Sequence, residues 1–149
     1  MLISDADLIE QRLRDARRIV VLGIKPESRR SLDAYGIPLY LSQVGYEVVP
    51  VVTRYPEVDT ILGRPVLRSL AAVEGPVDVL NVWVRADALA AYVDAIVALR
   101  PKVVWVQSGL LDEGVERALL DAGLDVIEDC IGCRRASMPP AWKPLWSLG

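Results

Sequence analysis

The chain contains five short apolar runs that recur at regular spacing, each followed at once by small, polar or charged residues. They cover residues 18–23, 46–52, 77–84, 102–107 and 124–128. A spacing of about 25–30 residues matches one strand plus the crossover to the next parallel strand. Near-continuous valine, isoleucine and leucine is typical of strands that are buried on both faces. The pattern therefore predicts an α/β fold: a doubly wound, mainly parallel five-stranded sheet with helices on both faces.

The first two segments outside these runs carry helix signals. Ser4 and Asp7 approximate a capping box at the start of an amphipathic helix over residues 5–17. A second helix is expected to close at Gly45, with Pro38 in its first turn. This placement is preferred because a proline in a helix interior costs about 3 kcal/mol.

Later segments differ in how clearly they predict helix. Residues 87–99 have helical spacing of apolar residues, and Asp112 is expected to cap the helix of the last crossover. Residues 55–66 contain two prolines and a glycine, so only residues 69–73 predict a short helical piece in that crossover. The apolar residues of segment 130–149 show no clear periodicity, so this segment is expected to form an irregular tail.

Length and charge limit the class of protein. The 149 residues are expected to form a single domain, residues 1–149. The net charge is −3 with acidic and basic residues interspersed, which argues against a nucleic-acid partner. No apolar run approaches the roughly 18–20 residues that span a bilayer, and the first residues do not resemble a signal peptide. We therefore expect a cytoplasmic protein with no membrane partner.

The chain contains no histidine. This absence excludes Ser-His-Asp and Cys-His catalysis, a phosphohistidine intermediate and imidazole metal sites. Two cysteines supply neither a disulfide framework nor four zinc ligands. No other catalytic constellation stands out, so a non-catalytic role is expected.

Glycine, polar and basic residues follow the predicted strands. In an open parallel sheet the carboxyl ends of the strands form the ligand crevice. Here these ends read Gly23-Ile24-Lys25, Thr53-Arg54, Arg85 and Gln107-Ser108-Gly109. Arg29 and Arg30, in the loop after the first strand, either contact phosphate or remain solvated. The set suits an anionic ligand that carries phosphate.

The loop after the first strand departs from the usual dinucleotide-binding pattern. A Gly-x-Gly-x-x-Gly fingerprint lets the backbone approach a pyrophosphate, but only Gly23 of that fingerprint is present. NAD-binding domains also place an acidic residue after the second strand, where this chain has Thr53 and Arg54. NAD is therefore disfavoured. Arg54 suits a phosphorylated ribose, as in NADP or coenzyme A, or is a solvated loop residue.

Several segments, taken in order, carry a resemblance to a known family. They are residues 20–23 with the proline-, serine- and arginine-rich loop that follows, residues 45–51, Arg54-Tyr55, Asp78-Val79 with Arg85, residues 102–109, and Asp129-Cys130-Ile131. Over residues 19–136 the chain resembles the small stand-alone CoA-binding proteins of bacteria and archaea. The same domain occurs at the front of succinyl-CoA synthetase α subunits and of nucleotide-forming acyl-CoA synthetases.

The resemblance implies a Rossmann-like domain that binds coenzyme A, or an acyl-CoA, across the strand ends. The implied contacts are Gly23, Ile24 and Lys25 with the diphosphate or pantetheine, Thr53 and Arg54 with the adenosine 3′-phosphate, Val84 and Arg85 with the adenine side, and Gln107, Ser108 and Gly109 with the pantetheine. Two positions depart from the family pattern. Lys25 stands where the family usually has a small hydroxyl residue, and the histidine that often follows the cysteine equivalent to Cys130 is absent.

Three further readings remain open. The chain is alternatively an NADP-binding enzyme or a subunit that lends its CoA site to a larger ligase. Cys130 and Cys133 have the spacing of a redox pair, although a thioredoxin-like use places that pair at a helix N-terminus after an early strand. Trp142 and Trp146 in the tail either seal a homodimer or cover the core.

Overall fold

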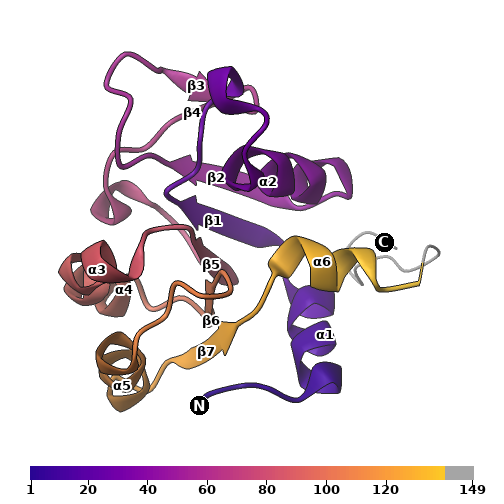
Figure 1. The fold of residues 1–149 in the computed structure, drawn as a ribbon, viewed down its shortest axis with the longest axis vertical. Coiled ribbons are helices and arrows are strands. Elements are labelled where there is room, and N and C mark those ends of the chain that lie inside the picture. The colour runs from indigo at the N-terminus through magenta and orange to yellow at the C-terminus, as the bar shows by residue number, and fades with distance from the viewer. Residues whose placement is uncertain (140–149) are drawn as a thin grey trace.

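The computed structural model describes residues 1–139 and contains one five-stranded parallel sheet (Figure 1). Its strands are β1 (Arg18–Leu22), β2 (Glu47–Val51), β5 (Val79–Val82), β6 (Val103–Val106) and β7 (Asp125–Glu128). Their order in space is β2-β1-β5-β6-β7, and every neighbouring pair is parallel. The predicted Rossmann-like architecture is confirmed, with each strand inside one of the five apolar runs.

Helices cover both faces of the sheet. On one face lie α1 (Ala6–Asp15), α2 (Asp33–Gln43) and α6 (Ile131–Ala136), and on the other lie α3 (Ala86–Leu89), α4 (Val93–Leu99) and α5 (Glu113–Asp121) (Figure 1). Alternate residues of β1 serve the two layers: Ile19 and Val21 pack with the first set of helices, whereas Val20 and Leu22 pack with the second. All four are at most 1 % exposed, which explains why their run lacks polar residues.

The order of strands reverses next to β1. The chain passes from β1 outward to β2 and then returns to β5 on the other side, which makes the ends of β1 and β5 the topological switch point. Gly23 follows β1 with a φ of 88°, and its N–H donates to the carbonyl of Val51 at 3.0 Å. A Cβ at Gly23 would lie 3.3 Å from the carbonyl carbon of Trp83, so a side chain would crowd this junction.

Two helices differ from the expected ones, the first at its N-cap and the second in its interior. The N-cap of α1 is Asp5 rather than Ser4, and its Oδ1 accepts from the N–H of Asp7 at 2.9 Å. The helix expected over residues 87–99 is interrupted by a 3₁₀ turn, η3 (Ala90–Tyr92), between α3 and α4. Leu89, before that turn, and Ile96, after it, are both fully buried. The 3₁₀ turn therefore leaves the apolar side chains of both helices packed against the sheet.

The prediction that Pro38 lies in the first turn of its helix is wrong, because Pro38 is in the interior of α2. A proline at this position cannot donate to the carbonyl one turn earlier, which belongs to Ala34. That carbonyl instead accepts from the N–H of Lys25 at 3.1 Å. The hydrogen bond missing inside the helix is replaced by one that fastens the loop after β1 to α2.

The expectation of an irregular tail over residues 130–149 is wrong for its first part, because residues Ile131–Ala136 form α6. This helix is too short to show a period, and Gly132 lets it approach α2: a Cβ there would lie 2.8 Å from the side chain of Ile37. Cys130 is its N-cap and is joined to Cys133 by a disulfide. Trp142 and Trp146 lie outside the described residues.

The crossover after β2 forms a small hairpin rather than a helix. Its strands are β3 (Thr60–Ile61) and β4 (Arg64–Pro65), followed by the 3₁₀ turn η2 (Leu70–Ala72). The Glu27 carboxylate, in the 3₁₀ turn η1 (Glu27–Arg29), accepts from the N–H of Leu62 at 2.9 Å and ties the hairpin to the loop after β1. Within residues 1–139, no helix is long and apolar enough to cross a membrane.

Candidate functional site

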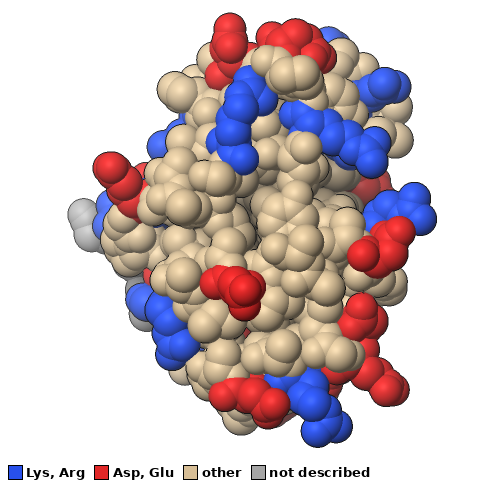
Figure 2. Space-filling view, turned by 90° about the vertical axis from the view of Figure 1, so that its left-hand side faces the viewer, with Lys and Arg blue, Asp and Glu red and all other residues tan. Residues whose placement is uncertain are grey.

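The predicted site residues follow β1, β2, β5 and β6, and all of these strands end at the same edge of the sheet. Figure 2 views the side toward which β1 and β2 point in Figure 1, which also carries α3, α4 and α5. Uncharged residues occupy much of the middle of the face, and the Lys and Arg side chains of its upper part lie next to Asp and Glu side chains, with further charges of both signs in its lower part. Charges of both signs therefore surround a largely uncharged centre on this face.

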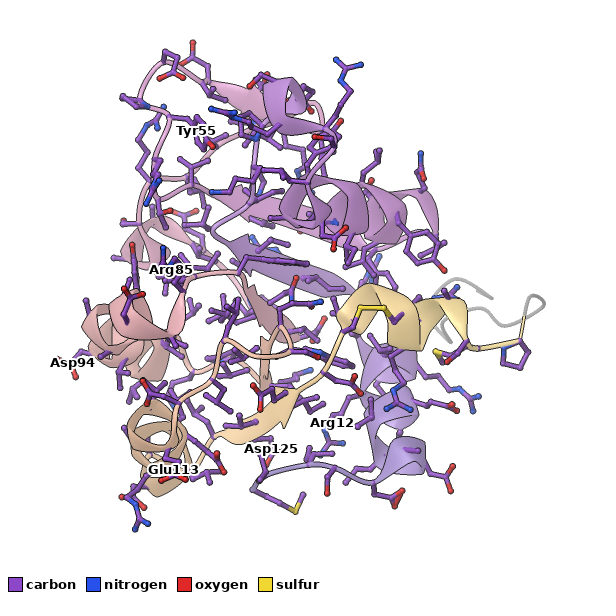
Figure 3. All side chains as sticks on the ribbon, viewed as in Figure 1. Arg12, Tyr55, Arg85, Asp94, Glu113 and Asp125 are labelled. Atoms are coloured by element: carbon purple, nitrogen blue, oxygen red, sulfur yellow. A yellow bond between two sulfur atoms is a disulfide. The ribbon has the colours of Figure 1, made fainter. Side chains whose placement is uncertain are left out.

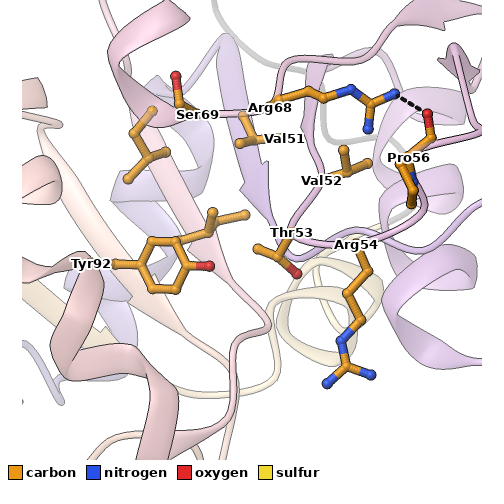
Figure 4. A pocket seen from close by; sticks show the side chains of 10 residues that line it. Val51, Val52, Thr53, Arg54, Pro56, Arg68, Ser69 and Tyr92 are labelled. Carbon is orange, nitrogen blue, oxygen red and sulfur yellow. Dashed lines mark hydrogen bonds between the residues drawn. The ribbon is translucent and has the colours of Figure 1, made fainter.

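A cleft of about 280 Å³ opens beside the end of β2 (Figure 4). Its polar lining comes from Thr53, Arg54, Arg68, Ser69 and Tyr92, and its apolar lining from Leu22, Val51, Val52, Pro56 and Leu70. The Arg54 side chain is exposed and makes no ion pair or hydrogen bond with any residue of the described chain. Its five N–H donors are therefore available to an anion.

Arg68 shapes the loop that carries Arg54. Its guanidinium donates to the carbonyls of Tyr55 at 3.2 Å, Pro56 at 3.2 Å and Val58 at 2.6 Å, the second of which is drawn in Figure 4. Tyr55 has a φ of 63°, a region that non-glycine residues rarely occupy. Arg68 therefore uses the donors of its guanidinium to hold this strained turn in place. The guanidinium of Arg54, in contrast, donates to no residue of the described chain.

Sequence reasoning missed Arg68, Ser69 and Tyr92. Arg68 and Ser69 reach the cleft because Leu67 forms an isolated parallel bridge with Val51 and extends the edge by one short segment. The sequence does contain a signal for Arg68 and Ser69: they follow the apolar pair Val66-Leu67, just as polar residues follow each predicted strand. Tyr92 is supplied by η3, whose position depends on the tertiary packing.

The loop after β1 contributes a side chain rather than a backbone donor. Ile24 is buried, and the N–H of Lys25 is already bonded to Ala34. The Lys25 Nζ lies 5.5 Å from the centroid of the Tyr55 ring, close enough for a cation–π contact that brings its charge to the β2 side. This lysine thus adds positive charge near the segment that bears Arg54.

Arg29 and Arg30 are exposed and lie in and just after η1. Arg30 Nε donates to the carbonyl of Glu27 at 3.2 Å. Burial, together with the nearby Glu27 carboxylate, raises the pKa of Tyr35 on the adjoining helix. The charge of this loop is therefore mixed.

At the centre of the edge, Val84 is buried whereas the Arg85 side chain is 81 % exposed. Arg85 Nε lies 3.5 Å from Asp87 Oδ1, an exposed ion pair of small energetic value. Figure 3 shows Tyr55 and Arg85 on the same side of the molecule. Arg85 is thus a second, largely uncommitted cation at the carboxyl edge.

The residues that follow β6 offer a hydrogen-bond acceptor rather than free N–H donors. The N–H groups of Gly109 and Leu111 both donate to Glu128 Oε2, at 3.1 and 3.3 Å, so they are not free for a phosphate. Gln107 Oε1 is buried and accepts no hydrogen bond within residues 1–139. Ser108 is exposed. A ligand group that donates an N–H or O–H, such as an amide, would satisfy Gln107.

The structure thus brings Lys25, Thr53 and Arg54 together at the β2 side, and it places Gln107, Ser108 and Gly109 farther along the same edge. Within the described residues, no group of three or more histidine, cysteine, aspartate or glutamate side chains is arranged to hold a metal ion. The arrangement can neutralise phosphate at one end and accept hydrogen bonds at the other.

Comparison with known proteins gives one family. Residues 17–136 match the family described as CoA binding domain. The uncharacterized protein YneT of Bacillus subtilis is 31 % identical over 124 residues, which cover 83 % of this chain and 88 % of that protein.

Solved structures share the fold. A Thermus thermophilus protein, described as cell-free ID.343, superposes with a TM-score of 0.81 at 32 % identity, covering 89 % of this chain and 98 % of that one. A hypothetical protein from Pyrococcus horikoshii OT3 gives a TM-score of 0.78 at 25 % identity, with 89 % and 91 % covered. A Bacteroides fragilis protein proposed to be an NADP oxidoreductase gives 0.51 at 14 % identity, covering 83 % of this chain and 63 % of that one, which shows the fold alone.

Proposed function

Because this chain belongs to the CoA binding domain family, we propose that it binds coenzyme A or an acyl-CoA at the carboxyl ends of its parallel strands, as a non-catalytic binding or regulatory protein. The observation that carries the proposal is Arg54, an exposed arginine without a partner in the described chain, on the wall of the cleft beside β2. A guanidinium matches the geometry of a phosphate group. We assign Arg54 to the adenosine 3′-phosphate.

The rest of the edge suits the remaining chemistry of the ligand. Lys25 supports the phosphate end by its charge, held near Tyr55. Gln107 Oε1, a buried acceptor without a donor in residues 1–139, suits an amide N–H of the pantetheine. The N–H groups of Lys25, Gly109 and Leu111 are already occupied, so side chains rather than backbone amides supply most of the polar contacts that we assign.

Calorimetric titration with coenzyme A and dephospho-coenzyme A tests this assignment on the wild-type protein and on Arg54→Ala. A charge-assisted contact of about 1.5–3 kcal/mol corresponds to a loss of roughly tenfold to a hundredfold in affinity. We expect that loss when either the 3′-phosphate or Arg54 is removed, and little further loss when both are removed. Arg85→Ala is the matched control, because Arg85 is also exposed at this edge; it should retain the discrimination between the two ligands.

Equal affinity of the wild-type protein for coenzyme A and dephospho-coenzyme A would show that Arg54 does not bind the 3′-phosphate. NADP is the second candidate ligand, because its 2′-phosphate presents the same chemistry to Arg54. Titration with NADP in the same series separates the two: preference for NADP over coenzyme A would assign the site to a nicotinamide dinucleotide. A second copy of the chain or a larger enzyme partner would be detected by the mass of the ligand-bound protein in solution.

A further inference from the structure

The second chemically distinctive feature of the molecule lies on α6. Cys130 and Cys133 are the two cysteines of the chain, and they are joined by a disulfide with a Cα–Cα distance of 5.3 Å (Figure 3). Cys130 is the N-cap of α6, and Cys133 lies in its first turn. The helix follows the last strand of the sheet, and neither cysteine lines the cleft beside β2.

The two sulfur atoms are on the accessible side of this helix. Cys133 is exposed and Cys130 is half-buried, whereas Ile131 and Gly132 between them are buried. Gly132 is pressed against Ile37 of α2, where a Cβ would lie 2.8 Å from the isoleucine side chain. The backbone is therefore anchored from one side, and the disulfide faces solvent on the other.

The disulfide does little to hold the fold together. It joins two residues three apart in the sequence, within one helical turn, and connects no two elements. The helix has other attachments: Ile131 and Met138 are buried in the core, and Arg134 Nη2 donates to Asp129 Oδ2 at 2.6 Å. Opening the bond therefore leaves α6 in place, unlike the opening of a disulfide that links distant segments.

The same backbone suits the reduced state. The N–H of Cys133 donates to Cys130 Sγ at 3.2 Å. After the bond opens, this hydrogen bond stabilises a thiolate on Cys130, which makes Cys130 the better leaving group. Cys133 is the more exposed residue of the two, so we take its Sγ as the atom that an incoming thiolate attacks.

From this geometry we propose that Cys130 and Cys133 are a redox-active pair that exchanges two electrons with low-molecular-weight thiols. A small thiolate attacks Cys133 Sγ, the bond to Cys130 breaks, and Cys130 leaves as a thiolate and takes up a proton. A second small thiolate attacks the small-molecule sulfur of the mixed disulfide and releases Cys133. The protein disulfide is reduced to two thiols, and two small thiols are oxidised to one disulfide, with two protons passing to the protein.

The experiment equilibrates the full chain in glutathione buffers of varied reduced-to-oxidised ratio, quenches with acid and labels free thiols with a maleimide–polyethylene glycol. Both cysteines should change together in one reversible transition, while the far-UV spectrum stays native. Glutathione is the probe so that the result does not depend on CoA binding. A pair that remains oxidised until the protein is denatured, or cysteines that titrate independently, would overturn the proposal.

Two variants test the order of attack. In oxidised glutathione, Cys130→Ser should accumulate a mixed disulfide on Cys133, seen by intact mass, because the resolving thiol is missing. Cys133→Ser should form its mixed disulfide more slowly, because Cys130 is less exposed than Cys133. Thermal unfolding like that of the wild-type protein establishes that each variant folds. Equal rates in the two variants would contradict the assignment of Cys133 as the attacked sulfur.

Discussion

The two edges of the sheet use their charged residues in opposite ways. At the amino edge, Asp78 Oδ2 accepts from the backbone N–H groups of Arg17 and Arg18, both at 2.9 Å, and Oδ1 lies 3.1 Å from Lys102 Nζ. At the carboxyl edge, Arg54 has no partner in the described chain. One edge therefore satisfies its charges internally, whereas the other keeps donors available.

The arginines of the two edges show the same contrast. Arg18 Nε pairs with Glu47 at 2.7 Å, and its Nη1 donates to the carbonyls of Glu74 and Pro76. Arg85 at the carboxyl edge has one exposed ion pair. Substitutions at the amino edge should therefore change stability without changing ligand affinity, and substitutions of Arg54, which has no partner at the carboxyl edge, should do the reverse.

The largest effect on stability is expected for Asp78→Ala. Two backbone N–H groups lose a charged acceptor, which costs about 2–3 kcal/mol of unfolding free energy in urea titrations. The affinity for coenzyme A should stay within about twofold, a free-energy change of less than 0.5 kcal/mol. Asp87→Ala is the control at the opposite edge and should leave stability within about 0.5 kcal/mol of wild type. A comparable loss of affinity in Asp78→Ala would break the separation between the edges.

Arg68→Ala should affect both properties, because Arg68 stabilises the loop that presents Arg54. Loss of its bonds to three carbonyls should lower the unfolding free energy by about 1 kcal/mol. A less ordered loop should weaken coenzyme A binding about fivefold, measured by calorimetry. Arg64→Ala on the neighbouring hairpin, whose guanidinium lies 4.0 Å from Glu47, is the control and should have a much smaller effect on binding.

At acidic pH, the dependence of stability on pH should include a contribution from Asp78 at the amino edge. Burial by itself would raise the pKa of Asp78, but the N–H groups of Arg18 and Arg17, together with Lys102, outweigh it and hold the pKa below its ordinary value of 3.8. Because the folded-state pKa is the lower one, the contribution of this carboxylate is present above the ordinary value. It is lost as the pH falls through the folded-state pKa.

The measurement is the unfolding free energy against pH for the wild-type protein and Asp78→Asn. The difference between the two should narrow as the pH falls through that range, and it should be constant above about pH 5, where the carboxylate is ionised in both states. A difference that is independent of pH would show that the charge of Asp78 contributes nothing.

The smallest effect is expected for Glu128→Gln, at the end of the carboxyl edge away from Arg54. Removing this charge should strengthen binding of the anionic coenzyme by about twofold at low salt, because a repulsive charge is lost. The gain should disappear at high ionic strength. A gain that persists in high salt would instead point to the N–H groups of Gly109 and Leu111, which the carboxylate now occupies.

The strands were predictable because burial on both faces leaves a continuous apolar run, as in Ile19–Leu22. The place of Thr53 and Arg54 at the sheet edge was predictable, because they come immediately after the run of residues 46–52. Arg68 and Tyr92 were not predictable, since the position of Arg68 depends on a single bridge between Leu67 and Val51, and that of Tyr92 on a 3₁₀ turn. The helix α6 escaped detection because one buried glycine, rather than an apolar period, fits it against α2.

The proline inside α2 has a consequence for anyone who engineers this protein. Standard stabilisation would replace Pro38 by alanine, because an interior proline costs a helix about 3 kcal/mol. The new amide at position 38 would then compete with Lys25 for the carbonyl of Ala34. A variant that gains this helical bond would lose the one that fastens the loop after β1 to α2, so a substitution inside a helix would loosen a loop at the edge of the sheet.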